Sequence, residues 1–159
     1  MIVLGVDPGT ACTGYAFLED RGGRIRVLEY GVIRNKSVDP LPFRLEKIHR
    51  ELKALMEVYH PGHMALESIF HSKFARSALI LGHARGAIMV AAHSLGVPVA
   101  EYAPRLVKQA TVGTGSASKQ RVGTLIQSHL GLKKPPTPAD AADALAIAFC
   151  HLIQGRRPY

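Results

Sequence analysis

Near its start the chain reads Ile2-Val3-Leu4-Gly5-Val6-Asp7, an apolar run that Pro8-Gly9 ends. A short run of this kind with a turn signal behind it is typical of a buried strand. Two further strands are predicted at Tyr15–Glu19 and Ile25–Arg34, and the short connection through Arg21-Gly22-Gly23 favours antiparallel pairing. The opening third of the chain is therefore predicted to form three antiparallel strands.

Apolar residues between Leu41 and Tyr59 recur every three or four positions, which predicts an amphipathic helix that His60-Pro61-Gly62 ends. After it we expect, in order, a strand at His63–Glu67, a helix at Ser77–Leu95, a strand at Val97–Tyr102, a helix at Ser118–Leu130 and a last helix to about Gln154, capped by Thr137 with Pro138 in its first position. The order β-β-β-α-β-α-β-α-α predicts an α/β fold. Its five-stranded mixed sheet has three antiparallel strands plus two parallel ones, with helices on both faces.

The length and composition indicate one globular domain. The 159 residues are 47% hydrophobic and 20% charged, which excludes an intrinsically disordered chain. We expect a single domain at residues 1–154 and a short basic tail at residues 155–159. Cys12 and Cys150 have no CxxC spacing, so neither a disulfide framework nor a zinc ribbon is supported. No membrane anchor or secretion signal is visible, and we expect a cytoplasmic protein.

The chain carries a large positive charge. Its 20 Lys and Arg residues against 12 Asp and Glu residues give a formal net charge of +8 and a pI near 9.8. A polyanion, either nucleic acid or an anionic membrane surface, is the expected partner. Composition alone does not choose between the two.

Four acidic residues are predicted to meet. Asp7 and Glu67 each end a strand, and in neighbouring parallel strands both would project from the same edge of the sheet. Asp140 and Asp143 are three residues apart in an alanine-rich stretch and so share one helix face. Four carboxylates would repel one another unless a divalent cation held them, and oxygen ligands suit Mg²⁺ or Mn²⁺. The chemistry that fits is metal-assisted phosphodiester hydrolysis, with two ions ~4 Å apart.

Each acid taken alone has a plainer interpretation. Asp7 could form an Asx turn, Glu67 could be a surface acid at a strand end, and Asp140 could favour the helix N-terminus. Asp143 is the hardest to explain in this way, because a core-like sequence follows it. Without these four acids the chain has 8 acidic and 20 basic residues, a charge of +12 around a site of −4. A basic surface around an acidic cleft is the arrangement that a nuclease needs.

The helix at Ser77–Leu95 is apolar on nearly every side, with Arg85 as its one cation other than histidine. It is predicted either to be a central helix or to meet a second subunit with its outer face. The segment Gly113–Lys119 lacks the spacing of a nucleotide-binding loop and is interpreted as a flexible loop near DNA phosphates. The eight histidines have no metal-ligand spacing.

An ordered set of motifs resembles the RuvC family of Holliday-junction resolvases. These motifs are Ile2–Thr10 with Thr13-Gly14-Tyr15, Ala65–Glu67, Ala84–Gly86, Glu101–Lys108, Gly115–Lys119 and Ala139–Ala146. The resemblance runs in order from Ile2 to about His151. It implies an RNase H-like fold, a homodimer, a branch-migration complex as partner, and Mg²⁺-dependent paired nicking of four-way DNA junctions.

The resemblance also implies roles for individual residues. Asp7, Glu67, Asp140 and Asp143 would bind the metal, two Mg²⁺ ions in each subunit with Mn²⁺ as a substitute, and Lys108 and Lys119 would act beside them near the scissile strand. Phe70 would stack on bases opened at the junction. Candidate DNA contacts are Phe70, Lys73, Arg76, Arg105, Lys108 and Lys119. The chain departs from the family at Ser68, where members often carry Gln, and at His71–Phe74.

Two other functions compete with this interpretation. A strand-end Asp followed by Gly-Thr is similar to the phosphate loop of actin-like and sugar-kinase ATPases, but that architecture duplicates the domain and this chain holds one copy. An architectural protein that binds bent or branched DNA would need the acids only for structure. It predicts junction binding without metal-dependent cleavage.

Overall fold

The computed structural model describes residues 1–68 and 75–155. The strands are β1 (Ile2–Asp7), β2 (Cys12–Arg21), β3 (Arg24–Arg34), β4 (His63–Glu67) and β5 (Val99–Tyr102). The helices are α1 (Leu41–Tyr59), α2 (Ala75–Ser94), α3 (Pro104–Val112), α4 (Lys119–His129) and α5 (Ala139–Gln154). Of the predicted tail only Gly155 lies within the described residues. No helix in this part of the chain combines the length and the apolar character needed to cross a membrane.

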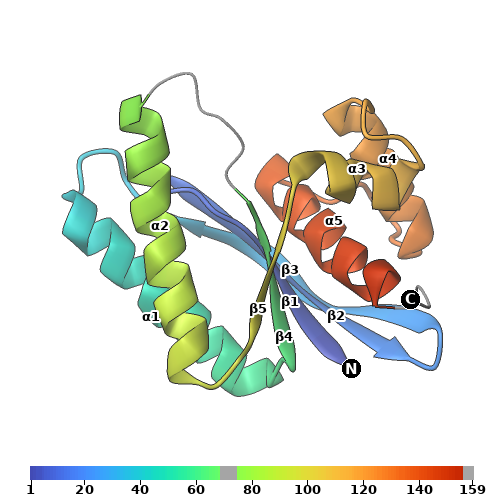
Figure 1. The fold of residues 1–159 in the computed structure, drawn as a ribbon, viewed down its shortest axis with the longest axis horizontal. Helices are drawn as coiled ribbons and strands as arrows, with labels where there is room; N and C mark the ends of the chain where they lie inside the picture. The colour runs from blue at the N-terminus through green and yellow to red at the C-terminus, as the bar shows by residue number, and fades with distance from the viewer. Residues whose placement is uncertain (69–74, 156–159) are drawn as a thin grey trace.

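The strands form one mixed sheet in the order β3-β2-β1-β4-β5 (Figure 1). β1 lies at its centre, antiparallel to β2 and parallel to β4. β3 extends the antiparallel side and β5 extends the parallel side. The predicted combination of three antiparallel strands with two parallel strands is therefore confirmed.

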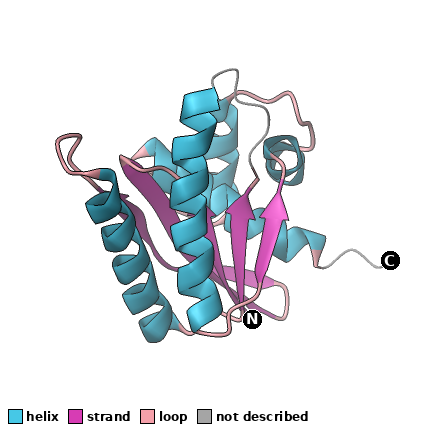
Figure 2. Cartoon of the chain, turned by 60° about the vertical axis from the view of Figure 1, so that its left-hand side comes forward, coloured by secondary structure: helices cyan, strands magenta, loops and turns pink. Residues whose placement is uncertain are grey.

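Helices cover both faces of the sheet. α1 and α2 lie side by side on one face, and α3, α4 and α5 lie on the other (Figure 1), while Figure 2 shows the first layer in front of the strands. Side chains alternate between the layers, as they do along any strand. In β1, Leu4 and Val6 enter the core beneath α1 and α2, whereas Val3 enters the core beneath α5. Gly5 and Asp7 share the face of Val3.

Several local predictions differ from the structure. β2 spans Cys12–Arg21 rather than Tyr15–Glu19, and α2 spans Ala75–Ser94 rather than Ser77–Leu95. The helix α3 was not foreseen, because it is only nine residues long and begins directly after a strand. Pro104 in its first turn is a helix-start signal, and Val107 is buried below it. β5 begins at Val99 rather than Val97. The last helix begins at Ala139 with Pro138 as its N-cap and no side-chain cap bond, so Thr137 does not cap it.

The helix α5 lies unusually close to the centre of the sheet. A Cβ atom at Gly5 would come within 2.6 Å of the Ala148 backbone nitrogen. A Cβ atom at Gly14, in β2, would collide with the backbone carbonyl oxygen of Asp140. Alanines on the inner face of the helix, such as Ala144, complete the close contact. The two glycines therefore let α5 rest almost backbone against backbone on β1 and β2.

This contact predicts that Gly14→Ala destabilises the protein by about 1–3 kcal/mol, the usual cost of overpacking a dense core. The matched control is Gly123→Ala in α4, where an added Cβ atom has no neighbour within 4 Å. That change should leave stability unchanged or raise it by up to about 1 kcal/mol, because alanine favours a helix. Urea unfolding of both variants measures the difference, and equal stabilities would contradict the packing argument.

Candidate active site

The four acids predicted from the sequence lie at one edge of the sheet. Asp7 is the last residue of β1, and Glu67 is the last residue of β4. Since these strands are parallel neighbours in register, the two acids leave the sheet side by side. Asp140 lies in the first turn of α5 and Asp143 follows one turn later, where the helix contacts β1 and β2.

The loop after Asp7 is held by side chains rather than by regular structure. The hydroxyl of Thr13, which is buried, donates to the Gly9 carbonyl oxygen at 2.7 Å. The Asn35 side chain donates to the Thr10 carbonyl oxygen at 2.9 Å. These bonds tie the loop to the adjacent ends of β2 and β3, which gives Asp7 a fixed backbone on both sides.

The carboxylates repel one another. Burial and then the negative charges of Glu67, Asp143 and Asp140 raise the pKa of Asp7 from 3.8 to about 7. The pKa of Glu67 is also raised, first by burial and then by the charge of Asp143. Lys119 lowers the pKa of both groups. The edge of the sheet thus concentrates negative charge in a partly dehydrated place.

Two lysines lie beside these acids. The ammonium of Lys119, the first residue of α4, donates to Asp143 Oδ2 at 2.8 Å. This hydrogen bond and the nearby negative charges raise the pKa of Lys119. Ser118 fixes the start of α4, since its side chain accepts from the Arg121 backbone nitrogen at 3.3 Å. Lys108 extends from α3.

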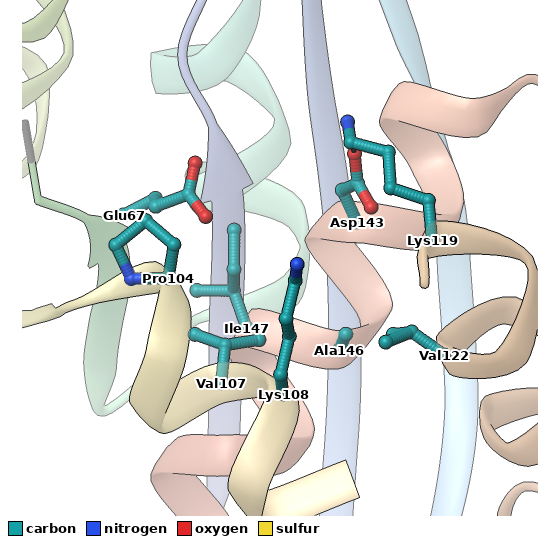
Figure 3. Close-up of a pocket in the computed structure, with 9 residues that line it drawn as sticks. All are labelled: Glu67, Pro104, Val107, Lys108, Lys119, Val122, Asp143, Ala146 and Ile147. Atoms are coloured by element: carbon teal, nitrogen blue, oxygen red, sulfur yellow. Dashed lines mark hydrogen bonds and ion pairs between the residues drawn. The ribbon is translucent and has the colours of Figure 1, made fainter. Parts of the chain in front are cut away.

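An open pocket of about 220 Å³ lies between β4, α3, α4 and α5. Figure 3 shows Glu67 on one side, Asp143 with Lys119 on the other, and Lys108 reaching between them. The remaining lining residues are apolar apart from their backbones: Pro104, Val107, Val122, Ala146 and Ile147. Asp7 is not among the described residues that line this pocket. Its charge nevertheless interacts with those of Glu67 and Asp143.

The chemistry of the donors suits a hard divalent cation. All four acids offer oxygen ligands, and the raised pKa values of Asp7 and Glu67 reflect a repulsion that a divalent cation would relieve. Within residues 1–68 and 75–155, however, no three His, Cys, Asp or Glu side chains surround a common point closely enough to bind an ion. Asp143 is paired with Lys119 instead. The residue types fit the predicted metal, while the side-chain arrangement is not that of a closed coordination sphere.

Two of the other predicted DNA contacts lie in the first turns of helices, and two lie outside the described residues. Arg76 is exposed in the first turn of α2, and Arg105 is exposed in the first turn of α3. The predictions for Phe70 and Lys73 lie outside the described residues. The loop before Lys119 is a short link that follows Gly113, whose φ of +83° ends α3.

Two neighbours of the acids were missed from the sequence. Cys12 lies beside Asp140, and burial together with a hydrogen bond to that residue raises the pKa of its thiol to about 11. Arg85 from α2 binds the Glu67 backbone carbonyl oxygen. Arg85 is the one cation other than histidine in the predicted segment Ser77–Leu95, and this was the available signal, but the sequence does not say which partner it meets.

Comparisons with known proteins agree with this geometry. A sequence model of the family described as crossover junction endodeoxyribonuclease RuvC matches residues 3–151. A RuvC from Syntrophomonas wolfei is 46% identical over 152 residues, which are 96% of this chain and 88% of that protein. The chain belongs to the RuvC family. Its ordered RuvC motifs therefore reflect true relatedness rather than chance similarity.

The RuvC likeness extends to the structure. The RuvC of T. thermophilus, solved in complex with a Holliday junction substrate, matches with a TM-score of 0.94 at 36% identity, covering 98% of this chain and 95% of that one. The yeast mitochondrial Holliday junction resolvase Ydc2 has a TM-score of 0.69 at 14% identity, covering 95% of this chain and 78% of its own, and shares the fold. The predicted RNase H-like fold is confirmed.

The raised pKa of Asp7 predicts how stability depends on pH in metal-free protein. Because the folded protein holds the proton up to about pH 7 while the unfolded chain releases it near 3.8, the free energy of unfolding falls as pH rises through this window. The loss from this group is on the order of 2–4 kcal/mol. Asp7→Asn should flatten the fall and be more stable than the wild type at pH 8.

Urea unfolding in EDTA at pH 5, 6, 7 and 8 measures this effect. Glu57→Gln serves as the control, because Glu57 is exposed on α1, which covers the opposite face of the sheet from α5. Its pH dependence should match that of the wild type. A wild type and an Asp7→Asn variant with parallel pH dependence would show that Asp7 is not under this charge repulsion.

Proposed function

We propose that the protein is a structure-specific endonuclease that resolves four-way (Holliday) junctions by paired symmetric nicks during recombination and repair. The observation that carries this proposal is the convergence of Asp7, Glu67 and the acidic pair of α5 on one edge of the sheet, together with two lysines. Family membership supports it, and T. thermophilus RuvC, similar over nearly the whole chain, was solved with a Holliday junction. Since the substrate is cellular DNA, the proposed place of action is the cytoplasm.

Asp7, Glu67, Asp140 and Asp143 are proposed to hold Mg²⁺, two ions in each subunit, with Mn²⁺ as a substitute. Bound there, the metal supplies an activated water and neutralises charge at the scissile phosphate. The carboxylates fix the position of this charge, because Asp7 and Glu67 stand on strands and the other two stand on a helix packed against those strands. Rigid elements of this kind hold a site more precisely than loops do.

Lys108 and Lys119 are proposed to bind the phosphate groups that flank the cut. Both line the pocket beside Glu67 and Asp143, and Lys119 stands more exposed, with 76% of its side chain accessible. Arg76 and Arg105, together with the predicted contacts Phe70 and Lys73, extend the proposed DNA surface. The remaining net charge of the chain attracts the DNA arms, since lysine and arginine release counterions from phosphates.

The carboxylates can be tested one at a time. Asp7→Asn, Glu67→Gln, Asp140→Asn and Asp143→Asn should each lower the rate of junction cleavage by at least about a hundredfold, because each removes one ligand charge at the reacting phosphate. Junction binding should be retained, since the basic surface is unchanged. A synthetic four-way junction with Mg²⁺, scored for nicks on each strand, measures cleavage, and a mobility shift in EDTA measures binding.

The matched control is Glu57→Gln, which removes an exposed acid on the opposite helical layer and should cut like the wild type. A carboxylate variant that cuts at the wild-type rate would remove that residue from the metal site. A wild type that binds the junction but never cuts it, with any of these metals, would favour the architectural DNA-binding protein instead.

The protein is further proposed to act as a homodimer and to receive junctions from a branch-migration complex. Two equivalent strands must be cut, so two sites related by a two-fold axis are needed. The outer face of α2 offers the contact surface: Leu79 and Val90 are 64% and 60% exposed. Gly82 and Gly86 line a shallow groove between α1 and α2 beside Val90, where a second helix could approach closely.

Val90→Glu is expected to give a folded monomer, because it places a charge on this apolar face. Val58→Glu in α1 is the matched control, since Val58 is 68% exposed and also lies on a helix. Sedimentation velocity at micromolar concentration should show a monomer for the first variant and a dimer for the second. A Val90→Glu protein that remains dimeric and makes paired nicks would place the interface elsewhere.

A further inference from the structure

Arg85 is a buried cation on the inner face of α2. Only 8% of its side chain is exposed, and its neighbours Ala84 and Ile88 belong to the core. A guanidinium removed from water is costly unless hydrogen-bond partners surround it. The position of Arg85 therefore depends on the groups that it contacts.

Those groups belong to the ends of two strands. Arg85 Nη1 donates to the backbone carbonyl oxygen of Glu67, and Nη2 forms an ion pair with Glu101 Oε2. The planar guanidinium can serve both partners at once, which a lysine ammonium cannot do in the same geometry. Arg85 thus joins the last residue of β4 to a residue of β5.

The pairing between β4 and β5 also ends at these residues. Leu66 and Glu101 are partners in the parallel ladder, and Glu67 pairs with Tyr102. The Ser68 backbone nitrogen then donates to the Tyr102 carbonyl oxygen at 2.9 Å. Beyond this bond the described strand ends. Arg85 adds a contact from the helical layer at the point where the ladder gives its final support to Glu67.

Arg85 approaches Glu67 from the face of the sheet that α1 and α2 cover. Met64 and Leu66 point into the core beneath α1 and α2, whereas Ala65 points toward α5. By this alternation the Glu67 carboxylate lies on the α5 face, where it lines the pocket with Asp143. Arg85 comes from α2 and is absent from the described wall of that pocket. Its hydrogen bond to Glu67 is made to the backbone carbonyl oxygen, and its positive charge also acts on the carboxylate, where it lowers the pKa.

We propose that Arg85 is a positioning residue, which fixes the peptide carbonyl of Glu67 and so aims its carboxylate at the metal site. Glu101 holds the guanidinium in place for this purpose. The inference rests on the proposed function, because it assigns Glu67 to metal binding. It also gives a role to Arg85 and Glu101. These two residues belong to the motifs Ala84–Gly86 and Glu101–Lys108, but neither is among the four acids or the two lysines of the proposed site.

The test measures binding of Mn²⁺ alone by isothermal titration calorimetry, in parallel with junction cleavage. Arg85→Met keeps much of the side-chain volume and removes both hydrogen bonds, and Arg85→Lys keeps the charge but not the fork. Both should weaken Mn²⁺ binding about 10–100-fold, the usual effect of losing a group that orients a metal ligand, with the lysine variant less affected. Cleavage at saturating junction should fall in the same order, while junction binding in EDTA stays within about twofold.

Arg50→Met is the matched control. Arg50 forms an ion pair with Glu46 at 2.8 Å on α1, but both side chains are more than half exposed. This variant should bind Mn²⁺ and cut junctions like the wild type. If Arg85→Met does not fold, Glu101→Gln carries the test, because it keeps the shape and hydrogen-bonding oxygen of Glu101 while it removes the charge that holds Arg85. It should weaken Mn²⁺ binding by a smaller factor.

A purely structural role would lower the melting temperature of the Arg85 variants and leave their Mn²⁺ affinity unchanged, which would overturn the proposal. A wild type that binds Mn²⁺ but does not cut junctions would refute the proposed function alone. In that case the difference in Mn²⁺ affinity between the wild type and Arg85→Met would still decide the role of Arg85.

Discussion

The contact of α5 with the two central strands is the constraint on which the rest of the structure depends. Gly5 and Gly14 leave no side chain between the helix backbone and the sheet. This closeness brings Asp140 and Asp143 to the edge where β1 and β4 end, so the acids of a helix and the acids of two strands share one place. A single methyl group at either glycine would push the helix outward. The charge cluster is therefore a consequence of backbone packing.

The same closeness makes the site electrostatically unfavourable without a counter-charge. Asp7 loses part of its hydration and faces three other carboxylates, which is why its pKa rises to about 7. Lys119 supplies one positive charge, directly paired with Asp143. The hydrophobic layers beneath α1 and α5 hold the acids together against this repulsion. A loss of folding stability of this kind is common at sites whose groups are arranged for chemistry rather than for folding.

Much of this arrangement could be predicted from the sequence, because it follows from short-range rules. Alternation along the strands and the turn signal at Pro8-Gly9 place Asp7 at a sheet edge, and the three-residue spacing places Asp140 and Asp143 on one helix face. The short helix α3 was missed, since nine residues carry little periodicity. The partners of Arg85 were also missed. Its contacts with Glu67 and Glu101 join residues 18 and 16 positions away, and no local pattern encodes them.

The sheet also divides the molecule into two compartments that can vary independently. The acids and lysines lie on the α5 side, whereas the exposed apolar face of α2 lies on the other. The sheet therefore separates substitutions on the outer surface of α1 and α2 from the carboxylates. Arg85 crosses this division by binding the end of β4 from the α2 side. A displacement of α2 would therefore reach Glu67 through Arg85.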